Sequence, residues 1–450
     1  MLIARHALIV GGGFSGTLLA INLLRHGSLS VTLIERDAAR LGRGLAYGAA
    51  HERHVLNVRA GNMSAFADQP GHFVDWLVQR GIGSDATFAT RRDYGAYLAE
   101  MLADMRDAAG DRLAILSDEV TGLDLSDQGG RLTLASGRWL EGDIVILAPG
   151  NLPPHDLPAF WGWSPPAYVN DPWSRDIAAG LSDDDHVLLL GTGLTAVDCA
   201  LTLDDAGFGG RITALSRRGL TPHTHAPAAA FTPIAERPAP SASALVGAVR
   251  RRSSEVGWRN AVDELRPFTQ GLWSLASPAD KARFLRHLRP FWDIHRHRIA
   301  PQVAERLEAM KARGQLSVLA GRVIDAEPAG HGLRLTWRAR GADDTTRMSV
   351  DRVVNCTGPL SDLSRTTEPL LRMLRRSGAI RPDPMNIGID VDQQARTIRR
   401  DGDANERLFA VGPMTRGAHW EIVAVPDIRK QVFDLARKLT AAHWVEAEGL

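Results

Sequence analysis

The chain has 450 residues, of which 44% are hydrophobic and 23% charged, the balance of an ordinary folded protein of two or three domains. Its formal net charge at pH 7 is only +1, so no strong overall field would recruit nucleic acid or a membrane surface. The two cysteines, Cys199 and Cys356, form no Cys-x-x-Cys pair, which excludes the dithiol relay of disulfide reductases.

No uninterrupted apolar run approaches the roughly 18–20 residues that a membrane-spanning helix needs, so we expect none. The first predicted strand begins within six residues of Met1, which leaves no room for a signal peptide. We therefore expect a cytoplasmic protein.

The chain opens with a predicted strand over residues 7–10, a glycine-rich turn and a helix over 17–25. The turn reads GGGFSG over residues 11–16 and fits the dinucleotide-binding fingerprint. In that fingerprint the first glycine permits a tight turn, the second lets the backbone approach a pyrophosphate, and the third packs the helix on the strand. The helix N-terminus then offers unpaired N–H groups and a positive dipole end to the phosphates.

The next predicted strand, residues 31–34, ends at Glu35, which lies 24 residues after Gly11. A carboxylate at about this distance can bind a ribose hydroxyl, and its charge repels a 2′-phosphate. The first site is therefore predicted to bind FAD or NAD. A glycine-rich turn that binds no nucleotide is the alternative.

The rest of the first half predicts a third strand over 112–117, a β-meander over 119–139 and a closing strand over 143–147, shortly before Gly150. A segment from residue 42 to about 99 interrupts this plan.

A second fingerprint follows, with a predicted strand over 187–190, the turn GTGLTA over 191–196 and a helix over 195–203. Two such motifs in strand–turn–helix context indicate two nucleotide cofactors with electron transfer between them.

The strand after the second fingerprint, residues 211–215, ends in Ser216-Arg217-Arg218. Two arginines and a hydroxyl here replace the acid, and forked guanidinium groups match phosphate oxygens. The second site is therefore predicted to bind NADPH rather than NADH. The alternative for the two arginines is an exposed basic strand end.

The second half repeats the plan of the first, with a strand over 316–319, a meander over 323–338 and a closing strand over 351–355. The chain then predicts a last strand over 407–411 and a helix over 426–439. This parallelism predicts an α/β fold of two Rossmann-like dinucleotide-binding domains, with the NADPH domain nested in the FAD domain.

We place the FAD domain at residues 1–165 and 360–450, and the NADPH domain at 166–359 with a helical insert over about 219–313. The insert begins with a Pro- and Ala-rich stretch that predicts a loop or linker. It is the expected substrate lid.

Three arginines of the insert, Arg283, Arg286 and Arg289, recur at three-residue spacing, so a continuous helix would place them on one side. They could bind a carboxylate or phosphate, or form a solvated basic face. Two His-x-His pairs, at 223–225 and 295–297, lack the further ligands that zinc requires, so no metal is expected.

Four strings carry a family resemblance: RGLAYG at 43–48, LNV at 56–58, WDIHRHR at 292–298 and GPMTRG at 412–417. With the two fingerprints, they resemble a bacterial group of FAD/NAD(P)-binding oxidoreductases that is similar to class B flavoprotein monooxygenases and amino-acid N-hydroxylases. The resemblance covers most of the chain and fixes no substrate.

The resemblance implies an NADPH-dependent FAD monooxygenase that uses molecular oxygen, through a C4a-hydroperoxyflavin, to hydroxylate a small nucleophilic substrate. N-hydroxylation of an amine or amino acid is the sharper expectation, and the substrate could be anionic. The alternative is an NADPH-flavin reductase or dehydrogenase that passes electrons to an acceptor without oxygen insertion. No nucleic acid or membrane partner is expected.

The chain departs from the family pattern at two positions. Gly412 is followed by Pro413 where many relatives carry an aspartate that contacts FAD, and Asn170 stands near the position of a histidine in class B monooxygenases. The resemblance also places Asn57 and Met63 beside the flavin ring. Helix 426–439, with Pro426 at its start, is expected to direct its positive end at the ring.

The predicted catalytic residues are Asn57 and Asn170. The residues predicted to bind FAD are Gly11, Gly13, Phe14, Ser15, Gly16, Glu35, Arg43, Tyr47, Asn57, Met63, Val120, Gly150, Gly412 and Val425. Those predicted to bind NADPH are Gly191, Gly193, Leu194, Thr195, Arg217 and Arg218.

Overall fold

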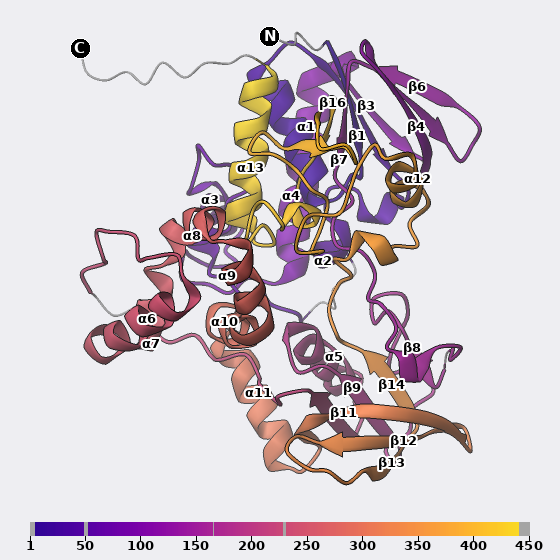
Figure 1. The fold of residues 1–450 in the computed structure, drawn as a ribbon, viewed down its shortest axis with the longest axis vertical. Helices are drawn as coiled ribbons and strands as arrows, with labels where there is room; N and C mark the ends of the chain where they lie inside the picture. The colour runs from indigo at the N-terminus through magenta and orange to yellow at the C-terminus, as the bar shows by residue number, and fades with distance from the viewer. Residues whose placement is uncertain (1–4, 49–52, 165, 228–230, 441–450) are drawn as a thin grey trace.

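Two lobes, each built on its own sheet, make up the chain, with a group of helices beside their boundary (Figure 1). The computed structural model describes residues 5–48, 53–164, 166–227 and 231–440. The predicted α/β class is confirmed, because both sheets have a parallel centre and the chain leaves the first sheet before it builds the second and returns to it afterwards.

The first sheet has the strand order β15-β16-β7-β1-β2-β3, and only the edge pair β15–β16 is antiparallel. A separate antiparallel meander, β4-β5-β6, covers one of its faces. The strands are β1 His6–Val10, β2 Ser30–Glu35, β3 Leu113–Ser117, β4 Val120–Ser126, β5 Gly129–Leu134, β6 Trp139–Gly142, β7 Ile144–Leu147, β15 Arg396–Ile398 and β16 Ala404–Ala410.

Strand β1 shows why the first sheet is buried on both faces. Successive side chains of a strand point to opposite faces, so Ala7 and Ile9 pack under the helices while Leu8 packs under the meander, and all three are fully buried. The helices of this lobe are α1 Phe14–His26, α2 Gly44–Gly48, α3 His72–Gln79, α4 Arg91–Ala109, α12 Pro369–Ser377 and α13 Val425–Leu439.

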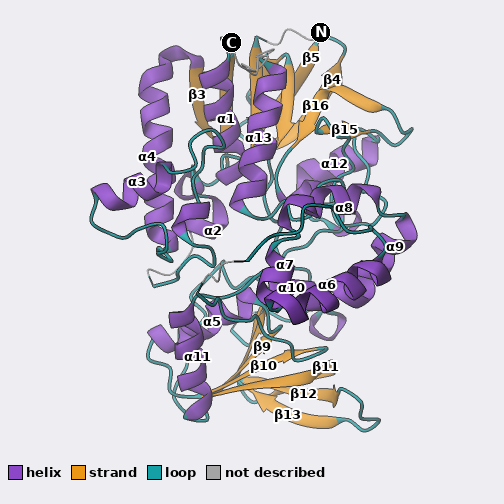
Figure 2. Ribbon diagram, turned by 90° about the vertical axis from the view of Figure 1, so that its left-hand side faces the viewer, coloured by secondary structure: helices purple, strands orange, loops and turns teal. Residues whose placement is uncertain are grey.

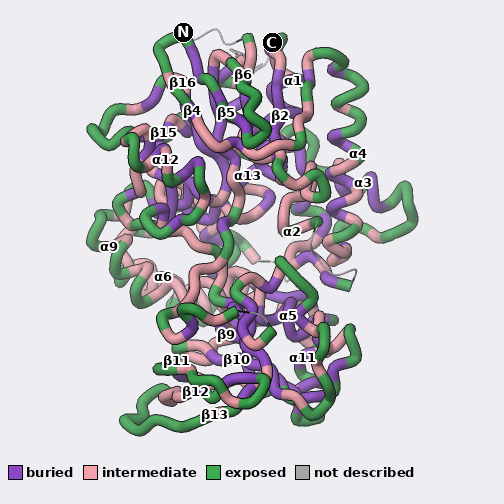
Figure 3. The backbone as a smooth tube through the Cα atoms, turned by 90° about the vertical axis from the view of Figure 1, so that its right-hand side faces the viewer, coloured by how far each residue is buried: buried purple, intermediate pink, exposed green. Residues whose placement is uncertain are grey.

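The second sheet has the order β13-β12-β11-β10-β9-β14-β8. Its strands are β8 Tyr168–Val169, β9 His186–Leu190, β10 Arg211–Ser216, β11 Leu316–Ala329, β12 Gly332–Ala339, β13 Thr346–Val350 and β14 Arg352–Asn355. Helices α5 Leu194–Asp205 and α11 Pro301–Ala312 cover one face. The central strands β9 and β14 are fully buried, whereas the edge strand β13 is largely exposed (Figure 3).

The second meander differs from the prediction, since it is continuous with its sheet. Strand β11 pairs with β10 in parallel and then continues into an antiparallel hairpin with β12. A register shift between Val323 and Asp325 marks the change, as expected where one strand bends between two partners. The predicted strand 316–319 is therefore only the first part of a longer one.

The internal repeat extends to side chains. In the first lobe Asp143 accepts the backbone N–H of His6, whose ring bonds Thr32 at 2.9 Å. In the second lobe Asp351 accepts the backbone N–H of His186, whose ring bonds Thr213 at 2.8 Å. The same polar triad thus joins the start of the first strand, the second strand and the turn before the closing strand in both lobes.

The helical insert rests on the first lobe, although it interrupts the second lobe in sequence (Figure 2). Trp273 stacks on Trp420 with ring centroids 4.7 Å apart, and its indole N–H donates to the carbonyl of Gly417. The chain enters and leaves the insert side by side, at an isolated bridge between Thr224 and Ile299. The insert helices are α6 Ala242–Val256, α7 Trp258–Asp263, α8 Thr269–Leu275, α9 Pro278–Arg283 and α10 Arg289–Arg296.

The three arginines of the insert do not share one helix side. A π-helical turn, Phe284–Leu288, separates α9 from α10, and Pro290 explains it, because proline lacks the N–H that a continuous α-helix requires. Arg283 and Arg286 are exposed, whereas Arg289 lines a cavity.

Both glycine-rich turns have the same backbone geometry. Gly11 has a φ of +105°, and a Cβ atom there would lie 2.2 Å from the carbonyl oxygen of Ala148. Gly191 has a φ of +131°, and a Cβ atom there would lie 2.4 Å from the carbonyl oxygen of Cys356. Only glycine allows this combination of positive φ and close approach.

Gly16→Ala is expected to destabilise the first lobe, because its Cβ atom would lie 1.9 Å from the carbonyl oxygen of Gly11. The cost of such overpacking is about 1–3 kcal/mol, and thermal unfolding measures it. The matched control is Ala196→Gly, at the same fingerprint position of the second turn, which should cost about 1 kcal/mol or less. A Gly16→Ala protein as stable as wild type would contradict this packing.

Candidate cofactor cleft

The first glycine-rich turn opens into a cavity of about 250 Å³ at the carboxyl ends of β1, β2 and β7. Helix α1 begins at Phe14, and no described side chain caps its N-terminus, so its first N–H groups are free to bind an anion. Nine of the predicted FAD-binding residues line this cavity: Gly11, Gly13, Phe14, Ser15, Glu35, Arg43, Tyr47, Val120 and Gly150.

Backbone hydrogen bonds fix the Glu35 carboxylate at this cavity. One oxygen accepts the N–H of Gly12 at 2.8 Å, and the other accepts the N–H of Asp37 at 3.1 Å. The opposite wall is aromatic, with Tyr47 edge-on to Phe14. Burial raises the pKa of Tyr47 to about 12, so its hydroxyl is neutral at physiological pH.

Six other predicted residues do not line the described cavities. Three of them are held by contacts inside the first lobe: Gly16 packs on Gly11, Met63 lies in the core, and the N–H of Gly412 donates to Gln431. The backbone carbonyl of Asn57 accepts a hydrogen bond from the ring of His225. Val425 is the buried first residue of α13, and Asn170 is exposed. Their roles at a cofactor stay predictions.

Helix α13 directs its first turn toward the first cavity. It begins at Val425, one residue earlier than predicted, so Pro426 occupies the second helical position. No side chain within the described ranges caps it, and Ile428 of the first turn lines the cavity. Its positive dipole end therefore faces the cavity.

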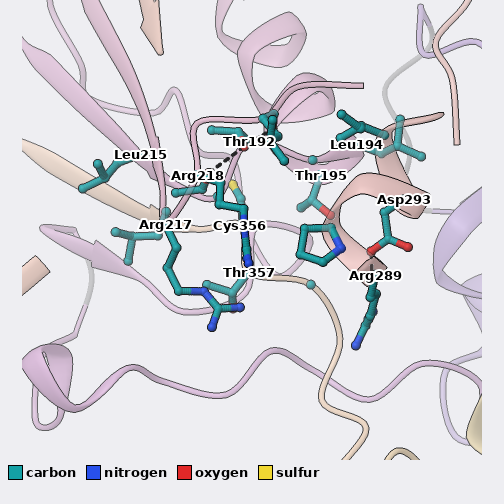
Figure 4. Close-up of a pocket in the computed structure, with 18 of the residues that line it drawn as sticks. Thr192, Leu194, Thr195, Leu215, Arg217, Arg218, Arg289, Asp293, Cys356 and Thr357 are labelled. Atoms are coloured by element: carbon teal, nitrogen blue, oxygen red, sulfur yellow. Dashed lines mark hydrogen bonds and ion pairs between the residues drawn. The ribbon is translucent and has the colours of Figure 1, made fainter. Parts of the chain in front are cut away.

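The second glycine-rich turn opens into a larger cavity of about 890 Å³. Helix α5 begins at Leu194 directly above it, again with no cap from a described side chain. All six predicted NADPH-binding residues line this cavity. Figure 4 labels four of them, Leu194, Thr195, Arg217 and Arg218, together with the turn residue Thr192.

Arg217 and Arg218 are available to an anion. Arg217 is exposed, Arg218 lies 5.8 Å from the ring of Phe291, and neither has a carboxylate partner among the described residues. The Ser216 hydroxyl, in contrast, is engaged within the turn, where it bonds the Thr192 hydroxyl at 2.8 Å. The two guanidinium groups, rather than the hydroxyl, are the free phosphate ligands.

A smaller cavity of about 190 Å³ joins the two. It shares Leu45 and Asn151 with the first cavity, and Thr195 and Gly358 with the second. The two turns therefore open into one run of cavities. Arg91 of α4 bridges the lobes beside it through an ion pair of 2.8 Å with Asp198.

One wall of the second cavity, which we call the charged wall, is formed by Asp293, Arg416 and Glu421, residues to which the sequence analysis gave no role. Asp293 comes from α10, and Arg416 and Glu421 come from the loop between β16 and α13. Burial raises the pKa of Asp293, whereas burial and the nearby Arg289 lower the pKa of Arg416 to about 10. The segments that contain Asp293 and Arg416, residues 292–298 and 412–417, both stand out in the sequence, but their spacing does not indicate that they meet.

Glu421 connects this wall to the insert. It is buried and has a φ of +68°, a rare conformation for a residue other than glycine. Its carboxylate accepts the indole N–H of Trp292 at 2.8 Å and lies 3.4 Å from Arg296 and 3.7 Å from His297. Such strain persists only where surrounding contacts enforce it.

The His-x-His pairs point to different partners. The rings of His223 and His295 meet edge to face, with centroids 4.6 Å apart, beside Trp258. His225 donates to the Asn57 carbonyl, and His297 faces Glu421. Burial lowers the pKa of both His223 and His225.

Residues 8–152 match a family model described as FAD-NAD(P)-binding. This match covers the first fingerprint and most of the residues that line the first cavity, and it agrees with the predicted nucleotide-binding unit. No curated protein matches the chain. Within the described ranges, no helix is both long and apolar enough to cross a bilayer.

Solved structures match the fold over nearly the whole chain. The reduced ornithine hydroxylase of Pseudomonas aeruginosa has a TM-score of 0.68 at 16% identity, over 98% of this chain and 99% of that chain. The ornithine N-hydroxylase of Kutzneria sp. 744, solved with reduced FAD, NADP⁺ and L-ornithine, gives 0.65 at 15%, over 98% and 99%. The FAD-bound cadaverine monooxygenase of Erwinia amylovora gives 0.66 at 14%, over 100% and 98%.

Glu421→Ala is expected to loosen the insert, because it removes every contact of the buried carboxylate and leaves Arg296 unpaired. Loss of the hydrogen bond from Trp292 and of the charge contacts with Arg296 and His297 should cost about 1–3 kcal/mol. Limited proteolysis should cut the insert faster than in wild type, while Glu421→Gln, which keeps an acceptor for Trp292, should lie between the two. Glu308→Ala, at an exposed pair with Lys311, is the control. Equal resistance of Glu421→Ala and wild type would exclude this tether.

Proposed function

We propose that the chain is an FAD- and NADPH-dependent monooxygenase that hydroxylates the nitrogen of a small amine or amino acid. The observation that carries this proposal is the run of cavities that joins two nucleotide-binding turns and ends at a charged wall. The fold, shared over its full length with N-hydroxylases, supports the same conclusion.

The residues of the two turns fit the two cofactors. At the first, the glycine cradle and the uncapped start of α1 suit the FAD pyrophosphate, and the fixed Glu35 carboxylate suits a ribose hydroxyl. At the second, the uncapped start of α5 suits a second pyrophosphate, and Arg217 with Arg218 suits a 2′-phosphate. When bound, FAD accepts hydride from NADPH and activates dioxygen.

The chain's own residues would position and shield this chemistry. The first turn of α13 provides a positive dipole end beside the first cavity, where negative charge develops on reduction. Insert residues such as Arg289, Asp293 and Ile294 line part of the second cavity, where they would limit the entry of water. The predicted catalytic roles of Asn57 and Asn170 gain no support from their positions.

The monooxygenase proposal is tested by measuring, for the FAD-loaded protein, how much NADPH is oxidised, how much hydrogen peroxide is released and how much product carries oxygen from labelled dioxygen. A monooxygenase should transfer label to an amine in proportion to NADPH. If all electrons reach peroxide or another acceptor with every amine and amino acid tried, the reductase alternative replaces the proposal.

Replacing Arg217 and Arg218 by Ala should weaken NADPH binding by about 1–3 kcal/mol for each arginine, because each would lose charged hydrogen bonds to phosphate. NADH binding should change little, so the selectivity for NADPH should fall. Kd values from titration of the flavin absorbance measure both. Arg211→Ala, at the exposed start of the same strand, is the control. Unchanged selectivity would remove the reason for naming NADPH.

A further inference from the structure

Arg416 is a buried cation in the charged wall of the second cavity, and no described carboxylate lies within ion-pairing distance of it. Its side chain is 8% exposed and lines the cavity. Its one hydrogen bond within the described structure is long, at 3.4 Å to the Ser361 hydroxyl. A guanidinium offers five donors, so most of them remain for a ligand.

The carboxylates around Arg416 already have other partners. Asp293 lies 3.5 Å from Arg289, and Glu421 faces Arg296 and Trp292. Asp383 accepts the backbone N–H groups of Met385 and Ile387. None of these carboxylates therefore forms an ion pair with Arg416, and a buried charge without a direct partner is costly unless a ligand compensates it.

The anion that Arg416 would bind is distinct from the NADPH phosphates. Those have the start of α5 and the pair Arg217–Arg218, all on the second lobe. Arg416 belongs to the first-lobe loop, and Val423 of the same loop also lines the first cavity. It therefore lies on the side of the cavity that continues toward the flavin site.

We propose that Arg416 binds the carboxylate of the substrate, so that the enzyme selects amino acids over amines that lack a carboxylate. The forked guanidinium matches a carboxylate with two parallel hydrogen bonds. This inference rests on the proposed function and adds to it the residue that recognises the carboxylate of the substrate.

The test uses matched ligands that differ only by the carboxylate: L-lysine with cadaverine, L-ornithine with putrescine, and each remaining amino acid with its decarboxylated amine. Each is titrated into the full-length FAD-loaded protein with NADP⁺ present, and the change in flavin absorbance gives the half-saturating concentration. In wild type, at least one amino acid should bind about tenfold or more tightly than its amine. A wild type that shows no such preference in any pair overturns the proposal.

Arg416→Gln should abolish that preference, while the flavin content and the Kd for NADP⁺ stay at wild-type values. The matched control is Arg283→Gln, the same change at an exposed arginine outside the cavity, which should keep the preference. A preference retained in Arg416→Gln, or a loss of NADP⁺ affinity in place of amino-acid affinity, overturns the assignment. The latter result would make Arg416 a coenzyme ligand.

Asp293→Asn gives a second arm that does not depend on the folding of an Arg416 variant. Removing this negative charge from the wall should lower the half-saturating concentration of the amino acid severalfold and leave that of the matching amine unchanged or higher. No change in either ligand counts against the proposal. All of these titrations measure binding and none depends on the transfer of labelled oxygen to a product. Failure of the monooxygenase proposal and failure of this inference are therefore distinguishable.

Discussion

The close contact between each glycine-rich turn and the end of a neighbouring strand is the constraint on which the architecture depends. Gly11 approaches the backbone of Ala148, and Gly191 approaches that of Cys356, in both cases where a side chain would collide. This contact brings the helix start, the acid or arginine pair at the next strand end, and the closing strand to one sheet edge. Ligands of open α/β sheets bind at this edge. The His–Thr–Asp triad repeats at the opposite end of the strands in both lobes.

The two lobes then differ in the side chains that end their second strands. A carboxylate ends the second strand of the first lobe, and two guanidinium groups end the second strand of the other. The first lobe has a separate meander over its sheet, whereas β11 of the second lobe runs from the sheet into the hairpin. The common backbone thus carries different side chains beside its two glycine-rich turns, and the smallest of the three cavities lies between them.

Much of the fold could be predicted from sequence because its signals are local. Buried parallel strands read as short apolar runs, and the turns follow them directly, so most predicted strands lie within two residues of the observed ones. All six NADPH-site residues line one cavity for the same reason. The charged wall could not be predicted, because Asp293 and Arg416 meet only through tertiary packing. The prediction that Arg283, Arg286 and Arg289 lie on one side of a continuous helix was wrong, because Pro290 interrupts that helix.

The mismatch between the insert's sequence position and its packing has a mechanical consequence. The insert leaves the chain after β10 and returns at α11, both in the second lobe, yet Trp273 and Glu421 bind it to the first. A rotation of one lobe against the other that kept these contacts would carry the insert with the first lobe. It would bend the chain at the paired crossings near Thr224 and Ile299, as well as at the two connections between the lobes, after β7 and after β14. Such a motion would widen the second cavity, while Arg416, on the first-lobe loop, would keep its distance from the first cavity.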